Sequence, residues 1–280
     1  AALSFFWPSL FAWLGDSHGP ARLSRATGAL NVGWSTGLML GGALAGWIYE
    51  ASPPLAFLVA IIPLMLARLS PPEERGHLPS PPEETAEHNA TPGTKRRLVA
   101  AWVGNTSACS LIGLLTGVFP KLGSTIGITP GKFGLLVAGM GLTRILIFLG
   151  LLLGFRWPRD WRVAAGAQLV AAAMVASVAS YSSQGWLHIV FAITGIAVGT
   201  TYSASLYASL AGDHARGLKS GLHEAALLIG LLFGTVGGGL MAHFWGLRAP
   251  YVPVACFGVA LVGLQIVLRL WARRPLSSQG

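Results

Sequence analysis

Apolar runs about as long as a bilayer-spanning helix follow one another along most of this 280-residue chain. A transmembrane helix needs about 20 mostly apolar residues. The first run is shorter than that and is interpreted as an incomplete helix. The pattern predicts an all-α fold, a polytopic transmembrane helix bundle of about nine spans arranged as three, a linker and six. The predicted spans are residues 1–15, 25–49, 53–69, 98–122, 130–155, 161–180, 186–211, 219–245 and 250–271.

The composition agrees with a membrane protein. Charged residues make up 10 % of the chain and hydrophobic residues 53 %, whereas an average soluble domain has about 25 % charged residues. The net charge of +9 does not predict a nucleic-acid partner, because the basic residues lie between the apolar runs, as membrane topology requires. Cys109 and Cys256 lie within apolar runs and lack metal-ligand spacing, so neither a metal nor a cofactor is expected.

A ladder of glycines in the second run returns in the eighth. In a bilayer, such glycines let two helix backbones approach closely. A repeated pair of spans is typical of a transporter built from internal repeats. The first ladder has Gly28, Gly37, Gly41 and Gly46, which recur 193 residues later as Gly221, Gly230, Gly234 and Gly239. Helix packing is predicted for Gly37, Gly41, Gly46, Gly230, Gly234 and Gly238.

Residues 70–97 separate two groups of spans. They contain six prolines and five glutamates and end in three basic residues. Such a composition buries too little apolar surface to fold, so this segment is predicted to be a flexible linker. It would join residues 1–69, the remainder of an N-terminal helix bundle, to a C-terminal six-helix bundle at 98–271. A polar tail at 272–280 follows.

Lysines and arginines are distributed unevenly between the two ends of the predicted spans. With the linker in the cytoplasm and the spans alternating, three basic residues fall outside: Lys121, Lys132 and Arg248. Fifteen fall inside: Arg22, Arg25, Arg68, Arg75, Lys95, Arg96, Arg97, Arg156, Arg159, Arg162, Arg216, Lys219, Arg269, Arg273 and Arg274. The positive-inside rule then predicts a multi-pass protein of the plasma (inner) membrane, with linker and C-terminus cytoplasmic.

These features together resemble the major facilitator superfamily. The ladder at 28–46 is similar to the antiporter motif of that family's fifth helix, with Gly42 in the place of its proline. The ladder at 221–239 resembles the eleventh helix, with Thr235 in that place. The segment 154–162 resembles the loop between the eighth and ninth helices. The resemblance implies that residue 1 falls within the fourth helix and that roughly three helices are lacking before it.

The resemblance also implies that the first, fourth, seventh and tenth helices line a central cavity. The sequence supports this independently, because hydroxyl and amide side chains gather on the predicted seventh and tenth helices, 98–122 and 186–211. Polar groups are costly in hydrocarbon unless they face a partner or water. Solute contacts are therefore predicted for Asn105, Thr201 and Tyr202. Trp34 is also assigned to solute contact, by stacking as for Tyr202, with helix packing as the alternative for both aromatic residues.

Arg144 is the most unusual charged residue. It precedes Arg156 by twelve residues, which places it about 18 Å along the helix from that end, near the middle of the bilayer. A mid-membrane arginine is costly and should face a cavity or a partner. Contact with an anionic or polar solute group, or a role in gating, is predicted. The alternative is a structural arginine that bonds helix carbonyls.

Glu224 is the only carboxylate well inside a predicted span. Three roles are open for it: proton coupling, a latch to a basic loop upstream, or a helix N-terminal acid. Its depth differs from that of Arg144 by roughly 10 Å, so no ion pair between the two is expected. Asn31 holds the equivalent repeat position and is grouped with the coupling or gating residues, with interhelical hydrogen bonding or solute contact as its two open roles. Arg159 and Asp160 are assigned to a cytoplasmic gate or, alternatively, to ordinary positive-inside charge.

The function predicted from these features is secondary active transport of a small solute by alternating access. Proton-coupled efflux by a monomer is the finer expectation, and it comes from the resemblance. An enzyme is not expected, because the intramembrane charges lie at different depths. A truncated membrane fragment with a structural role and no transport stays open as the rival hypothesis.

Overall fold

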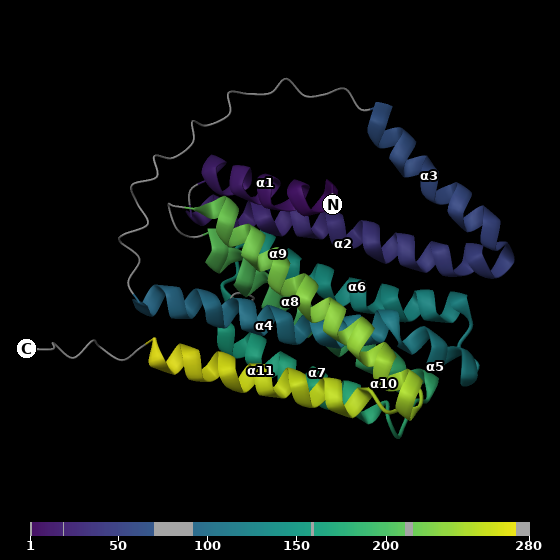
Figure 1. The fold of residues 1–280 in the computed structure, drawn as a ribbon. Coiled ribbons are helices and arrows are strands. Elements are labelled where there is room, and N and C mark those ends of the chain that lie inside the picture. The colour runs from purple at the N-terminus through teal and green to yellow at the C-terminus, as the bar shows by residue number, and fades with distance from the viewer. Residues whose placement is uncertain (1, 19, 70–91, 158–159, 211–214, 273–280) are drawn as a thin grey trace, which may run out of the picture.

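The computed structural model describes residues 2–18, 20–69, 92–157, 160–210 and 215–272. Regular structure in these residues is helical throughout (Figure 1), which confirms the predicted all-α fold. Five helical segments are long and apolar enough to cross a membrane: Gly93–Thr125, Pro130–Leu152, Gln184–Leu210, Arg216–Trp245 and Tyr251–Trp271. Two shorter apolar helices cover Pro53–Pro63 and Trp161–Ser177.

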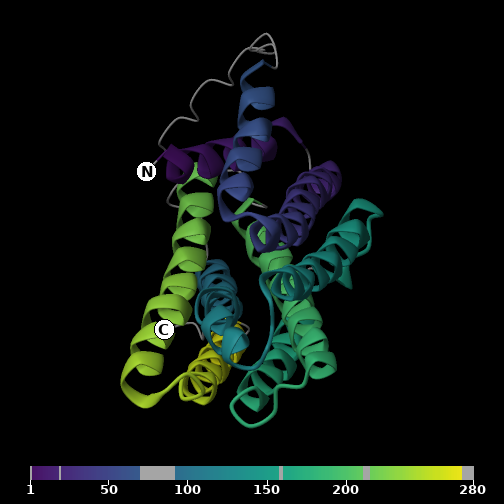
Figure 2. The ribbon, with the colours of Figure 1, turned by 90° about the vertical axis from the view of Figure 1, so that its right-hand side faces the viewer.

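The first group of helices matches the predicted spans closely. It consists of α1 (Ala2–Ser17), α2 (Pro20–Ala51) and α3 (Pro53–Leu69). At 32 residues α2 has the length of a span, but its glycines and polar residues leave it less apolar than the five segments above. Figures 1 and 2 show this group on one side of the molecule.

The second group forms the larger body. It consists of α4 (Pro92–Gly117), α5 (Phe119–Thr125), α6 (Pro130–Leu152), α7 (Trp161–Ser177), α8 (Gln184–Leu210), α9 (Arg216–Leu232), the π-helical segment η3 (Phe233–Gly237), α10 (Gly238–Trp245) and α11 (Tyr251–Trp271). The predicted span 219–245 is thus one rod containing a π-helical segment. α4 and α5 separate at Val118, because Pro120 has no backbone N–H and its ring disrupts the preceding turn.

The linker prediction needs one correction. Residues 92–97 belong to α4, whereas residues 70–91 lie outside the described part of the chain. Lys95, Arg96 and Arg97 are exposed, so the helix can continue past the apolar stretch while its charges stay in water. A change from apolar to charged residues indicates where the chain leaves the hydrocarbon core of the membrane, but a helix can continue beyond that point.

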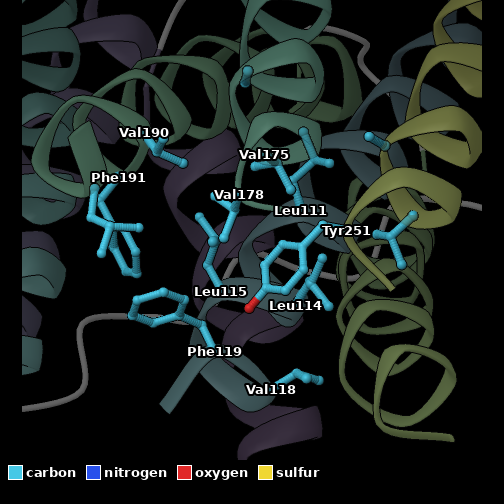
Figure 3. Close-up of a cluster of buried hydrophobic side chains, with 14 of the residues drawn as sticks. Leu111, Leu114, Leu115, Val118, Phe119, Val175, Val178, Val190, Phe191 and Tyr251 are labelled. Carbon is cyan, nitrogen blue, oxygen red and sulfur yellow. The ribbon is translucent and has the colours of Figure 1, made fainter. Parts of the chain in front are cut away.

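A buried apolar core holds the second group together. It gathers side chains from α4, α5, α6, α7, α8 and α11 around Phe119, Phe191 and Tyr251 (Figure 3). A smaller cluster around Phe11, Leu23 and Phe148 joins α1 and α2 to α6 and α8. The two groups are therefore packed against each other through side chains as well as through glycines.

The contact between the two groups runs mainly along α2 and α6, which are antiparallel. A Cβ atom added to Gly28 would lie 2.7 Å from the backbone N of Leu152, and one added to Gly134 would lie 2.7 Å from the carbonyl O of Gly42. Neither position leaves room for a side chain. The two backbones touch near both ends of the pair.

Four of the six glycines predicted to pack do so. A Cβ on Gly46, Gly230, Gly234 or Gly238 would meet, respectively, the carbonyl of Pro130, the carbonyl of Thr106, the carbonyl of Ser110 and the side chain of Leu114.

Gly37 and Gly41 differ from the prediction, because no described atom lies within 4 Å of a Cβ at either position. The reason is the helical period. Gly37 follows Gly28 by nine residues, which is about two and a half turns, whereas Gly46 follows it by eighteen, about five turns. Gly28 and Gly46 therefore share one face, and Gly37 and Gly41 lie on the other.

Gly230→Leu is expected to lower the free energy of unfolding by about 1–3 kcal/mol, the usual cost of overpacking. A Cβ there would collide with the Thr106 carbonyl and lie 3.0 Å from Cβ of Cys109. Gly239→Leu is the matched control in the same rod, because nothing lies within 4 Å of its Cβ position. Thermal unfolding in detergent measures both, and equal effects would contradict this account of the ladder.

Candidate functional site

Arg144 lies on α6 beside the contact of that helix with α8. The contact is close because α8 carries glycine there: a Cβ on Gly199 would lie 3.4 Å from Cα of Arg144. One residue earlier, the Thr143 hydroxyl donates to the carbonyl of Ala192 on α8 at 2.9 Å. These contacts fix the backbone from which the Arg144 side chain projects.

The Arg144 side chain is buried without a neutralising partner. Its exposed fraction is 6 %, and its Nε has no hydrogen-bond partner among the described residues. Within the same residues, no ion pair joins it to a carboxylate, Glu224 included. No hydrogen bond to a helix carbonyl is recorded there either, so these contacts do not support a purely structural arginine. Its guanidinium carbon instead lies 5.5 Å from the ring centroid of Trp34 on α2.

The ring of Trp34 that contacts this guanidinium belongs to a chain of aromatic side chains from both helix groups. Trp34 stacks on Tyr202 of α8 with centroids 6.2 Å apart, and Trp7 of α1 meets Trp34 edge-on at 5.8 Å. Phe148 meets Tyr202 edge-on with centroids 6.1 Å apart. Trp7 and Trp34 remain half-buried. We call Arg144, Trp34, Tyr202 and Trp7 the central cluster.

Glu224 lies on α9, next to His223, whose ring meets that of Tyr202 edge-on with centroids 4.8 Å apart. Its carboxylate interacts with the Tyr202 side chain, and its Oε1 lies 3.7 Å from Nε2 of His223. His223 is fully buried, and its Nδ1 is 2.8 Å from the hydroxyl of Ser205 on α8. Its Nε2 has no hydrogen-bond partner among the described residues. A buried cation and a largely buried carboxylate thus lie in this region, and no ion pair joins them among the described residues.

The remaining predicted site residues are placed as follows. Asn105 joins α4 to α9, because its Nδ2 donates to the carbonyl of His223 at 3.4 Å. Asn31 donates to the carbonyl of Thr27 in its own helix at 2.8 Å. Thr201 is 2 % exposed, and its hydroxyl has no partner among the described residues.

The structure describes one of the two residues predicted to form a cytoplasmic gate, Asp160. Asp160 accepts a hydrogen bond from the backbone N of Arg162 at 2.9 Å and so caps the start of α7. Asp and Asn are favoured at this position because they satisfy free N–H groups of the first turn. Arg159 lies outside the described residues.

A polar contact that the sequence analysis did not identify joins α1 to α9. Nη1 of Arg216 lies 2.7 Å from Oδ1 of Asp16, and the Ser220 hydroxyl donates to the carbonyl of Pro8 at 3.2 Å. Both residues of the ion pair lie at helix ends, where sequence gives no hint of the partner. At the other end of the molecule, the carboxylate of Glu50 accepts from the backbone N of Gly131 at 2.9 Å.

The central cluster also includes Trp7, which the sequence analysis missed. Trp7 lies in the run interpreted as an incomplete helix, and no signal in the sequence would pair it with Trp34. His223, which is buried beside Glu224, was not predicted as a site residue either. In the part of the chain that the structure describes, no group of three His, Cys, Asp or Glu side chains could hold a metal ion.

Comparison with known proteins identifies the family. No curated protein sequence matches the chain. The family model described as Major Facilitator Superfamily matches residues 1–215, which includes α1–α8 and therefore Trp34, Arg144 and Tyr202. Its members are secondary transporters and not enzymes. With this match and its membrane-spanning helices, the chain belongs to the major facilitator superfamily and is a multi-pass integral membrane protein.

Proposed function

We propose that this protein moves a small solute by alternating access, with the solute bound at the central cluster. The observation that carries the proposal is the buried guanidinium of Arg144, which no described carboxylate neutralises and which contacts Trp34 from the other helix group. A mid-membrane arginine without a structural partner indicates a solute pathway. A solute held there would touch both groups, so it could favour one relative arrangement of them over the other.

We further propose that Glu224 couples transport to protons. Its carboxylate is 17 % exposed and is placed beside two other titratable side chains, His223 and Tyr202. A proton bound by this group would change the charge facing the central cluster. The likeness of the glycine ladder to an antiporter motif supports exchange of solute against protons, that is, efflux.

The proposed orientation places the loop between α1 and α2 in the cytoplasm, together with the linker and the C-terminus. The excess of lysine and arginine at that end supports this arrangement, since cytoplasmic loops carry such an excess. We propose the plasma (inner) membrane as the location and a monomer as the working unit.

Glu224→Gln is expected to abolish proton movement coupled to solute while leaving solute exchange intact. The amide keeps the size and hydrogen-bonding capacity of the side chain but cannot take up a proton. The protein, expressed from its complete open reading frame, is reconstituted into vesicles that contain a pH-sensitive dye. Solute-dependent pH change should disappear in the variant, and counterflow of labelled solute should persist.

Asp160→Asn serves as the control, because it removes an exposed carboxylate that caps α7. Normal proton movement in Glu224→Gln would remove Glu224 from the mechanism. Loss of both proton movement and counterflow would assign this residue to solute binding or folding instead of coupling.

A further inference from the structure

The central cluster has the charge of an anion site. Nε of Arg144 is buried and unpartnered among the described residues, and the guanidinium presents a planar fork of N–H donors. Glu224, a carboxylate on α9, lies 3.7 Å from His223, and no ion pair joins it to Arg144 among the described residues. A planar oxyanion such as a carboxylate would match the fork and offset the cost of burying the charge.

The walls of the same cluster have the chemistry of an aromatic-ring site. Trp7 and Trp34 meet at 5.8 Å and keep part of their surface exposed. Trp34 also lies against the guanidinium at 5.5 Å. Aromatic faces and edges bind other rings in offset or edge-on arrangements. The cation and the exposed indole surface are therefore within the span of one small molecule.

We infer that the solute is a small aromatic carboxylate, whose carboxylate binds Arg144 and whose ring packs against Trp34 and Trp7. The inference rests on the proposed function, because it assigns the chemical class of the solute to the same site. It excludes organic cations, which the guanidinium of Arg144 would repel. It also ranks aliphatic acids below aromatic ones, because they leave the indole surface uncovered.

Binding to the purified protein tests this with matched probes. The acids are benzoate, phenylacetate and indole-3-acetate, and each is compared with its primary amide. Acetate supplies the charge without the ring, and phenethylamine supplies the ring with a positive charge. Affinity is obtained from the rise in unfolding temperature with probe concentration, since a ligand of the folded state stabilises it.

At least one aromatic acid should bind about tenfold more tightly than its amide, than acetate and than phenethylamine, which corresponds to about 1.4 kcal/mol. In Arg144→Gln the preference for acid over amide should vanish. In Trp34→Leu the preference for the aromatic acid over acetate should vanish. Arg248→Gln, which removes one positive charge outside the cluster, should change neither preference.

Amides binding as tightly as acids, or the amine binding most tightly, would overturn the inference. The proposed function is tested separately by uptake of the whole panel into vesicles. Uptake of a cation or a neutral compound that depends on Arg144 would refute the anionic class and leave solute transport at this cluster standing. If Arg144→Gln leaves the uptake of every accepted compound unchanged, both the aromatic-carboxylate inference and the proposed solute site at the central cluster are refuted.

Discussion

Replacing Arg144 by glutamine is expected to abolish solute transport without lowering the stability of the protein. Removing one member of a buried charge pair costs about 2–5 kcal/mol, so if the solute supplies the other member, transport should fall at least about 30-fold. Stability should hold or rise, because the folded protein buries this cation without a described partner. Solute uptake and thermal unfolding in detergent measure the two quantities on one preparation.

Arg248→Gln is the matched control and should behave in the opposite way. Arg248 donates to the carbonyl of Val178 at 2.9 Å and to the hydroxyl of Ser182 at 3.0 Å. Its loss should lower stability by about 1 kcal/mol and leave transport near the wild-type rate. If Arg144→Gln also lowered stability and kept its transport, Arg144 would be a structural residue after all.

Two engineered disulfides between the helix groups are each expected to stop transport reversibly. A Cβ on Gly217 of α9 would lie 3.9 Å from Cβ of Ala12 on α1, and a Cβ on Gly42 of α2 would lie 3.8 Å from Cβ of Val137 on α6. Both distances fit the mean Cβ–Cβ distance in disulfides, about 3.8 Å. Alternating access requires the two groups to separate, so either bond should block the cycle.

The cysteine pairs are introduced after Cys109 and Cys256 have been replaced by alanine. Transport by each oxidised double variant is compared with transport after reduction, and the reduced form should recover. A pair at Gly123 and Ile128, whose Cβ positions are 3.4 Å apart within the second group, should form its bond and leave transport unchanged. Full transport with either inter-group bond in place would mean that the groups do not move apart there.

The positions of the helices could be predicted well from the sequence, because hydrocarbon thickness and hydrogen bonding within the backbone leave few alternatives. Residues 53–69 form a helix with the predicted bounds. The start of α4 was less predictable, since a helix can extend into water beyond its apolar stretch. The two faces of the glycine ladder could have been predicted, because Gly28 and Gly37 are nine residues apart. At 3.6 residues per turn this spacing places them on opposite faces of the helix.

The candidate site was only partly predictable. The depth of Arg144 along its helix identified it before any neighbour was known. Its neighbours come from other helices, and the sequence does not specify how those helices rotate and cross. The stacking of Trp34 on Tyr202, the Ser205–His223 contact and the Asp16–Arg216 ion pair depend on that geometry. They are properties of the packing between distant segments.

Thiol labelling of a Trp7→Cys variant from each side of the membrane tests the account most directly. Trp7 belongs to the central cluster, and a cysteine there reports whether water reaches it. In a background without Cys109 and Cys256, a membrane-impermeant thiol reagent should label this cysteine from either side, and a bound solute should slow both reactions. Labelling from one side alone, or from neither, would contradict a central cluster that opens to the two sides in turn.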